Sequence, residues 1–252
     1  MFPYIYIFGS NVSMYNICAM SGFLIAVFMF LRRTKGVFPK DVQDSIIAVL
    51  GADIPFVIAG AILHNKCSFA GSVGEFFDIL FKDTGIAFLG GLTGGLIGFL
   101  FLFPLLAGRS IPMIKAMEAL VPSMIAGHAV GRIGCLLGGC CYGKPSGWGV
   151  VYQAGTPAYE AYGAIKLFPV QAVEAALLFI LLLVILAIGR NAVSIYLIGY
   201  SIIRFSLEYL RGDVRGKTGF LSPAQKICTI MFLLTVCMKY AVHKKRSLQN
   251  RF

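Results

Sequence analysis

Charged side chains are scarce in this sequence, and acidic ones are the scarcest. Only 13% of the 252 residues are charged, with 11 Asp and Glu against 22 Lys and Arg, whereas a soluble domain carries about 25% charged residues. Tryptophan occurs once, and the seven cysteines are an odd number. These shortages exclude an intrinsically disordered chain, a disulfide-stabilised scaffold and an ordinary soluble protein.

Two further signatures are missing. The sequence contains no Walker-type or dinucleotide-binding fingerprint, so we expect no nucleotide and no other cofactor. Its net charge of +11 comes from short basic clusters between apolar runs rather than from one patch. A protein that binds nucleic acid gathers its basic residues on one face, so we expect no nucleic-acid partner.

Long apolar runs are what the chain does contain. Hydrophobic residues make up 58% of it, and the mean hydropathy is +0.82. A helix needs about 20 apolar residues to cross a bilayer core of about 30 Å. Seven segments approach or reach that length, near residues 14–31, 44–63, 85–107, 112–130, 168–188, 192–210 and 223–242. The sequence therefore predicts an all-α integral membrane protein with about seven transmembrane helices, in a single domain over residues 1–252.

The basic residues predict how these helices are oriented. Residues 1–13 carry no charge, whereas Arg32, Arg33 and Lys35 follow the first apolar segment. The positive-inside rule then places the N-terminus outside the cell. An odd number of helices puts the basic C-terminal tail in the cytoplasm and residues 131–167 outside.

A glycine-rich stretch, residues 127–145, lies at the outer end of the fourth segment. It holds six glycines together with His128, Arg132 and three cysteines. Glycine at this density interrupts a helix and lets backbone N–H groups face a ligand, and Arg132 offers a planar cation suited to phosphate. The alternative is a re-entrant turn whose arginine reaches lipid headgroups. His128 is a candidate general base, and a hydrogen-bonded histidine without a catalytic role is the alternative.

A second group of charges lies near the end of the sixth segment. Arg204, Glu208 and Arg211 are spaced i, i+4 and i+7, so one helix would present all three on one face. Two cations and one anion leave a positive pocket suited to an anionic lipid headgroup, whereas an ion network that only fixes helix packing is the alternative. The acidic residues Asp53, Glu118 and Glu174 lie within apolar segments, and we expect each to pair with an arginine.

The cysteines near the glycine-rich stretch have an unusual spacing. Cys135, Cys140 and Cys141 form C-x4-C-C rather than the C-x2-C of a zinc ribbon or a thioredoxin-like site. We therefore expect no metal. A membrane thiol oxidoreductase that uses these three cysteines remains an alternative function.

Several blocks of the sequence are similar to one known family. Gly131-Arg132-Ile133-Gly134, followed by Gly139 and Gly143, resembles the signature of the prolipoprotein diacylglyceryl transferases of bacterial inner membranes. Further blocks agree in order and spacing over nearly the whole chain: Tyr15, Phe88-Leu89-Gly90-Gly91, Pro169-Val170-Gln171 with Glu174, Arg204-Phe205 with Glu208, Arg211 and Asp213, and Gln225.

The resemblance implies an enzyme that moves a diacylglyceryl group from phosphatidylglycerol to the lipobox cysteine thiol of a prolipoprotein signal peptide. It implies a multi-pass protein of a bacterial cell (plasma or inner) membrane. We expect Arg132 and Arg211 to hold the phosphate and His128 to activate the thiol. The expected substrate-binding residues are Tyr15, Gly131, Gly134, Cys135, Gly139, Gly143, Gln171, Arg204 and Glu208.

The sequence departs from the family pattern at several positions. Leu89 stands where the family has a histidine, and Cys135 and Cys140 stand where it has an asparagine and an acidic residue. His128 has no counterpart in the usual pattern. The chain therefore resembles a divergent member, in which His128 replaces the missing base, the substrate differs, or activity is lost. The last case is a non-catalytic paralogue that binds lipid or presents the substrate.

Overall fold

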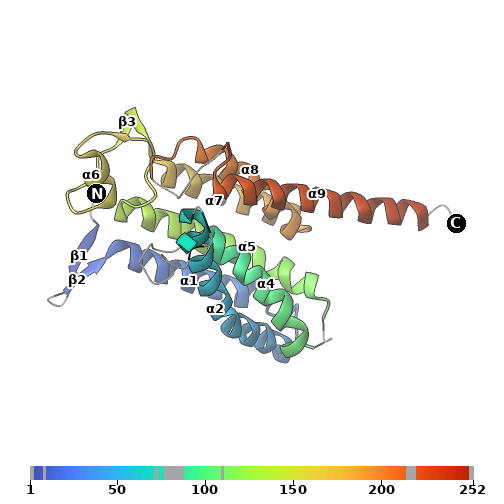
Figure 1. Cartoon of the computed structure of the whole chain (residues 1–252). Coiled ribbons are helices and arrows are strands. Elements are labelled where there is room, and N and C mark those ends of the chain that lie inside the picture. The colour runs from blue at the N-terminus through green and yellow to red at the C-terminus, as the bar shows by residue number, and fades with distance from the viewer. Residues whose placement is uncertain are drawn as a thin grey trace. The chain divides into compact units, whose positions relative to one another are not determined.

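The computed structural model is mostly helical (Figure 1) and describes residues 3–7, 10–70, 72, 74–76, 88–108, 111–213 and 220–249. The helices are α1 (Met14–Thr34), α2 (Lys40–Phe69), α4 (Phe88–Leu106), α5 (Met113–Gly138), α6 (Pro157–Tyr162), α7 (Val170–Ile188), α8 (Ala192–Glu208) and α9 (Pro223–Gln249). Three short strands, which the sequence analysis does not predict, are β1 (Tyr4–Ile7), β2 (Ser10–Ser13) and β3 (Pro145–Val150).

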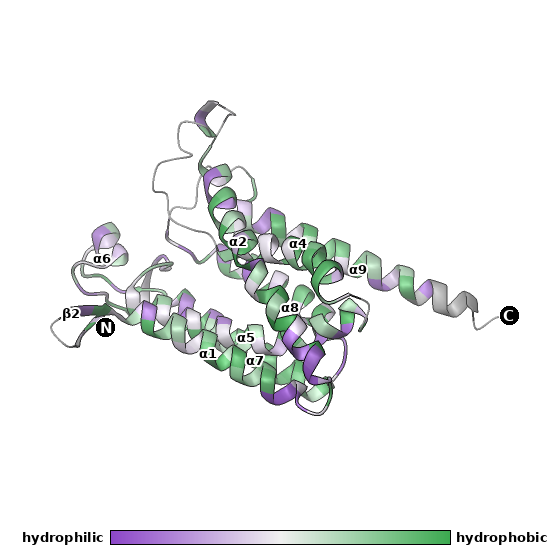
Figure 2. Cartoon of the chain, turned by 90° about the horizontal axis from the view of Figure 1, so that it is seen from below, coloured by the Kyte–Doolittle hydropathy of each residue, from purple (hydrophilic) through white to green (hydrophobic). Residues whose placement is uncertain are grey.

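Six of these helices are long and apolar enough to cross a membrane: Met14–Thr34, Lys40–Phe69, Phe88–Leu106, Met113–Gly138, Val170–Ile188 and Pro223–Val242. They coincide with six of the seven predicted segments and are largely hydrophobic along their length (Figure 2). The remaining segment is α8, which has 17 residues and spans about 26 Å at 1.5 Å per residue. A helical membrane protein is therefore confirmed, while the count of seven and the orientation stay predictions.

Proline does not end the membrane helices. Pro55 lies inside α2, Pro104 inside α4 and Pro122 inside α5. A proline removes one backbone hydrogen bond, but neighbouring helices and local adjustments satisfy the freed groups in membrane helices. The second and fourth apolar segments consequently form continuous helices despite their prolines.

The chain divides into two compact units. One comprises Met1–Met29, Leu120–Asp213 and Ala224–Phe252, and the other comprises Phe30–Ala119 and Val214–Pro223. Both are discontinuous in the sequence. The single domain over residues 1–252 stays a prediction.

Glycines set the packing within each unit. In the second unit, a Cβ atom on Gly60 would collide with the backbone of Gly90 and Gly94, so α2 and α4 are in direct backbone contact. In the first unit, a Cβ on Gly127 of α5 would lie 2.8 Å from the carbonyl oxygen of Gly22 in α1. Small residues permit such approach between membrane helices. The glycines of α4 therefore serve close packing.

Candidate functional site

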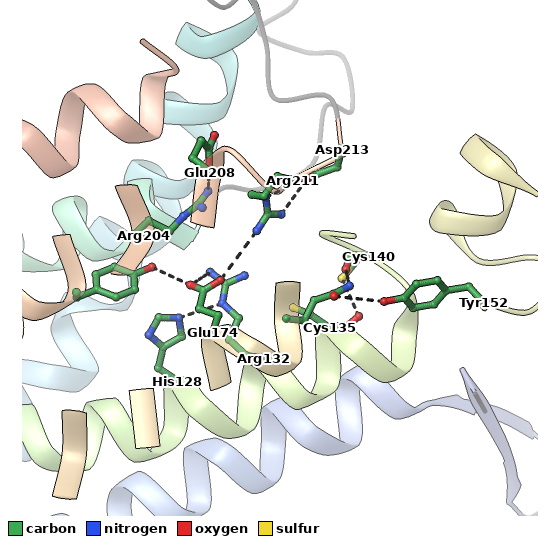
Figure 3. A network of polar contacts seen from close by, with 12 residues as sticks. His128, Arg132, Cys135, Cys140, Tyr152, Glu174, Arg204, Glu208, Arg211 and Asp213 are labelled. Carbon is green, nitrogen blue, oxygen red and sulfur yellow. Dashed lines mark hydrogen bonds and ion pairs between the residues drawn. The ribbon is translucent and has the colours of Figure 1, made fainter. Parts of the chain in front are cut away.

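Glu174 forms the centre of a buried polar network in the first unit (Figure 3). It lies in the first turns of α7, and its side chain is completely buried. Arg132 of α5 places Nη2 3.0 Å from Oε1 of this carboxylate, and Arg211 places Nη1 4.0 Å from Oε2. A buried charge needs an opposite charge or hydrogen bonds to offset its lost hydration. The predicted pairing of Glu174 with an arginine is confirmed.

His128 and Arg132 are neighbours on one face of α5. The Nε–H group of Arg132 donates a hydrogen bond to Nε2 of His128 over 3.3 Å, one helical turn away. Both side chains are buried. The lone pair with which Nε2 would accept a proton is therefore engaged by a guanidinium group.

Tyr200 of α8 closes the network on its other side. Its hydroxyl donates to Oε1 of Glu174 over 3.4 Å, and its ring meets the His128 imidazole edge-on with 5.3 Å between the ring centres. Oε1 of Glu174 thus interacts with the guanidinium group of Arg132 and accepts a hydrogen bond from Tyr200. Tyr200 was not among the predicted site residues, since a single tyrosine in an apolar helix has no distinguishing spacing.

Arg204 and Glu208 form a second ion pair at the end of α8. Nη2 of Arg204 lies 2.5 Å from Oε2 of Glu208; Arg204 is buried and Glu208 is half-buried. The prediction that Arg204, Glu208 and Arg211 share one helical face is right for the first two residues. It is wrong for Arg211, because α8 ends at Glu208. Arg211 instead extends from the turn that follows.

The turn after α8 holds Arg211 firmly. Its Nε and Nη2 groups each donate to the Asp213 carboxylate over 2.9 Å. Burial disfavours the charge on Arg211, but its electrostatic contacts with Cys141 and Asp213 outweigh burial and raise its pKa above the ordinary value. The guanidinium therefore stays charged throughout the physiological range.

The glycine-rich stretch is hydrogen-bonded through its backbone to the turn that contains Arg211. The N–H of Lys144 donates to the carbonyl of Leu210 over 2.9 Å, and the N–H of Gly212 donates to the carbonyl of Tyr142 over 3.0 Å. Between them, Gly143 leaves no room for a side chain, because a Cβ atom would collide with the carbonyl of Phe168. Gly143 is thus needed where two segments meet.

Gly139 and Gln171 shape the turn that follows α5. Gly139 has a φ of 69°, a left-handed conformation that favours glycine. The Gln171 amide donates to the Cys140 carbonyl over 2.7 Å and accepts from the Tyr152 hydroxyl over 3.2 Å. Burial raises the pKa of the Tyr152 phenol, which therefore stays protonated and able to donate. Gln171 was among the predicted site residues, whereas Tyr152, which lies outside every motif, was not.

The other expected substrate-binding residues differ in their surroundings. A Cβ atom on Gly134 would lie 2.8 Å from Cβ of Cys18 and 3.3 Å from the carbonyl oxygen of Tyr15. Gly134 therefore packs α5 against α1, and Tyr15 itself is exposed. At Gly131 a Cβ atom would meet nothing within 4 Å in the described part of the chain. Open space thus adjoins the helix next to Arg132.

All seven cysteines lie in the described part of the chain, and none of them forms a disulfide there. The sulfur atoms of Cys135, Cys140 and Cys141 lie within 4.8 Å of one another. The alternative function, a membrane thiol oxidoreductase, would have three adjacent thiols at this place, with no disulfide among them.

Two residues singled out in the sequence belong to the other unit. Leu89 is buried in α4. Asp53 of α2 is buried against Gly95 and Gly98 of α4, and within the described residues it forms no ion pair with an arginine. The pairing expected for Asp53 is therefore not observed.

Comparison with known proteins gives one consistent family. The family model described as prolipoprotein diacylglyceryl transferase matches residues 3–241. A relative from Clostridium perfringens, named phosphatidylglycerol–prolipoprotein diacylglyceryl transferase 2, is 30% identical over 94% of this chain and 93% of its own length. Transferases of the same name, without the numeral, from Clostridium tetani and Methylococcus capsulatus are each 29% identical. They cover 91% and 83% of this chain, and 93% and 80% of their own lengths.

Proposed function

Since the chain belongs to the prolipoprotein diacylglyceryl transferase family, we propose that it transfers a diacylglyceryl group from phosphatidylglycerol to the lipobox cysteine of a prolipoprotein. The products are a thioether-linked diacylglyceryl cysteine and glycerol phosphate. We place the protein in the bacterial inner membrane with seven helices across it, the N-terminus outside and the C-terminus in the cytoplasm.

The observation that supports this reaction best is the convergence of two arginines on one buried carboxylate. Arg132 and Arg211 both approach Glu174, and Asp213 supplies a second negative charge beside Arg211. The 4.0 Å between Arg211 and Glu174 exceeds hydrogen-bond length, and Nη1 of Arg211 has no hydrogen-bond partner among the described residues. This charged nitrogen of Arg211 is therefore available to donate a hydrogen bond to a phosphate.

The proposed step forms one bond and breaks another. The lipobox sulfur attacks the glycerol carbon that is bonded to the phosphate oxygen, so a C–S bond forms as the C–O bond breaks. The electron pair leaves with glycerol phosphate, and fixed cations stabilise a charge that develops where they already point. Arg132 and Arg211 are our proposed catalytic residues for this stabilisation.

The thiol must lose its proton, because the thiolate is the nucleophile. His128 is the proton acceptor that the sequence indicates, and its Nε2 atom already accepts from Arg132. If His128 acts as a base through Nε2, its hydrogen bond with Arg132 must break. If His128 instead orients Arg132, this hydrogen bond must persist. The paired Arg204 and Glu208 are proposed to hold the end of α8 from which Arg211 extends.

A reconstituted assay tests the proposed function. Purified full-length protein is incubated with phosphatidylglycerol vesicles and a peptide that carries a lipobox, and mass spectrometry detects the lipidated peptide. We expect product from the wild type and a loss of at least 100-fold in Arg132→Ala, since one preorganised charged donor contributes about 10²–10³ in rate. Arg190→Ala, at an exposed position before α8, is the matched control and should keep the full rate.

Leu89 favours one competing function. A buried leucine in α4 occupies the family histidine position and cannot accept a proton. A non-catalytic paralogue would bind phosphatidylglycerol through the same arginines without turnover. Saturable lipid binding with no product, with phosphatidylglycerol or with other anionic phospholipids, would therefore reject the transferase in favour of the paralogue.

A further inference from the structure

Three thiols gather where α5 ends and the outer turn begins. Cys135 is buried in the last turn of the helix, and Cys140 and Cys141 are half-buried in the turn. Their sulfur atoms all lie within 4.8 Å of one another. Figure 3 shows Cys135 and Cys140 close together beside the end of α5. Cys135 is one of the expected substrate-binding residues, but none of the three thiols forms or breaks a bond in the proposed transfer step.

The backbone that gathers these thiols is held at several points. Gly139 and Cys141 both have left-handed backbone conformations, with φ of 69° and 57°. Such a conformation is uncommon for a non-glycine residue and marks a turn that its surroundings enforce. The Gly139 carbonyl accepts from Ala158, and the Cys140 carbonyl accepts from Gln171. The three thiols are thus gathered by a fixed turn.

The spacing of the sulfur atoms is close to that of a metal site. Metal–sulfur bonds of about 2.3 Å separate the sulfur ligands of one ion by about 3.8–4.0 Å. The three sulfurs need to approach one another by no more than about 1 Å from their present limit of 4.8 Å. Side-chain rotations alone supply movements of that size.

The ligand set favours one kind of ion. Structural Zn²⁺ sites are closed by four ligands, whereas this group comprises three sulfurs with no fourth histidine, cysteine or carboxylate ligand among the described residues. Purely thiolate ligands suit soft ions, of which Cu(I) accepts as few as two or three. Three thiolates with Cu(I) carry a net charge of −2. Arg132 and Arg211, which both interact electrostatically with Cys141 and are also paired with carboxylates, offset part of this charge.

We propose that Cys135, Cys140 and Cys141 bind one Cu(I) ion in a three-coordinate thiolate site. Each thiol releases its proton to solvent as its sulfur binds the ion, and no electron is transferred. The spacing C-x4-C-C does not predict this site, because the turn after α5, and not the helical repeat, brings the sulfurs together. The proposal does not depend on the transferase activity.

Anaerobic titration tests the site. Full-length protein in detergent receives Cu(I) from its complex with a chromogenic chelator, and the bound copper is counted after desalting. We expect one copper per chain in the wild type and at least a tenfold weaker affinity in Cys140→Ser and Cys141→Ser. Cys67→Ser and Cys237→Ser, at exposed positions elsewhere in the chain, are matched controls that should bind like the wild type.

A second measurement needs no variant. Copper should protect Cys135, Cys140 and Cys141 from alkylation in wild-type protein, as peptide mass spectrometry reports, and leave Cys67 and Cys237 unprotected. X-ray absorption at the copper edge should show a first shell of sulfur only. Equal copper binding by wild type and a folded triple Cys→Ser variant would overturn the proposal, as would a first shell containing nitrogen or oxygen.

The tests separate this proposal from the transferase function. Lipidated peptide without copper binding would reject the metal site alone. Stoichiometric copper binding without lipidated peptide would support the metal site and reject the transferase.

Discussion

At the scale of single residues, Glu174 determines the charge state of the site. Its carboxylate pairs with Arg132, lies near Arg211 and accepts from Tyr200. Removing one partner of a buried ion pair leaves an uncompensated charge and costs about 3–5 kcal/mol. The stability of this unit should therefore depend strongly on a residue that has no place in the transfer step itself.

Glu174→Ala should accordingly lower the free energy of unfolding by about 3–5 kcal/mol, because Arg132 would stay buried without its counter-charge. Thermal unfolding in one detergent measures this loss. Glu160→Ala, which removes an exposed carboxylate in α6, is the matched control and should leave the midpoint nearly unchanged. Equal midpoints for the two variants would contradict the role of Glu174.

Substitutions at His128 can distinguish two roles for this histidine, which are to position Arg132 and to act as a base. A glutamine in its place can still accept from Nε of Arg132, but it cannot take up a proton at neutral pH. If His128 positions Arg132, His128→Gln should keep most of the rate and His128→Ala should lose about 10²-fold, the effect of misplacing a reacting group by about 1 Å. The peptide lipidation assay across pH 6–9 measures both variants.

A base gives a different pattern in the same assay. Both His128 variants would then be equally slow, and the fall in rate on the acidic side of the pH profile would disappear. A full rate in His128→Ala would remove the histidine from both roles.

At the scale of secondary structure, long apolar runs predicted the helices well, since bilayer thickness demands about 20 apolar residues. Their ends were harder to predict. Arg204, Glu208 and Arg211 have a helical spacing, but α8 stops at Glu208, and Gly212 bonds to Tyr142 instead. Contacts between distant segments decide such an ending, and a single sequence does not contain them. The strands β1 and β2, which pair with each other, have only four residues each and were also not predicted.

Two glycines on α5 should respond oppositely to the same change. Gly134→Ala places a methyl group against Cys18 and the Tyr15 carbonyl, and overpacking of this kind costs about 1–3 kcal/mol. Gly131→Ala meets open space, so the helical preference of alanine should stabilise α5 by about 0.5–1 kcal/mol. Thermal unfolding of the two variants under identical conditions checks the prediction. A lower midpoint for Gly131→Ala than for Gly134→Ala would contradict it.

At the scale of the whole molecule, α8 decides the topology. Six helices have the length and hydropathy of membrane spans, and α8, with 17 residues, is shorter than each of them. If α8 crosses the bilayer, both the turn before it and the C-terminus lie in the cytoplasm. If it does not, these two points lie on opposite sides of the membrane.

Reporter fusions resolve the two topologies. We expect a phosphatase that is active only outside the cytoplasm to be inactive when fused after Arg190 or at the C-terminus, and active when fused after Gln153. A fluorescent protein that folds only in the cytoplasm should give the reciprocal pattern at the same three points. An active phosphatase at the C-terminus, with an inactive one after Arg190, would contradict seven spans.

The pairing of Glu174 with two arginines also bears on how the proposed reaction would cycle. The carboxylate is a resident anion that lies beside both arginines. A phosphate that binds there would share the charge of the two arginines with Glu174. The resident carboxylate lowers the affinity for substrate and for glycerol phosphate alike. It thereby keeps two permanently charged arginines from retaining the leaving group, so that turnover continues.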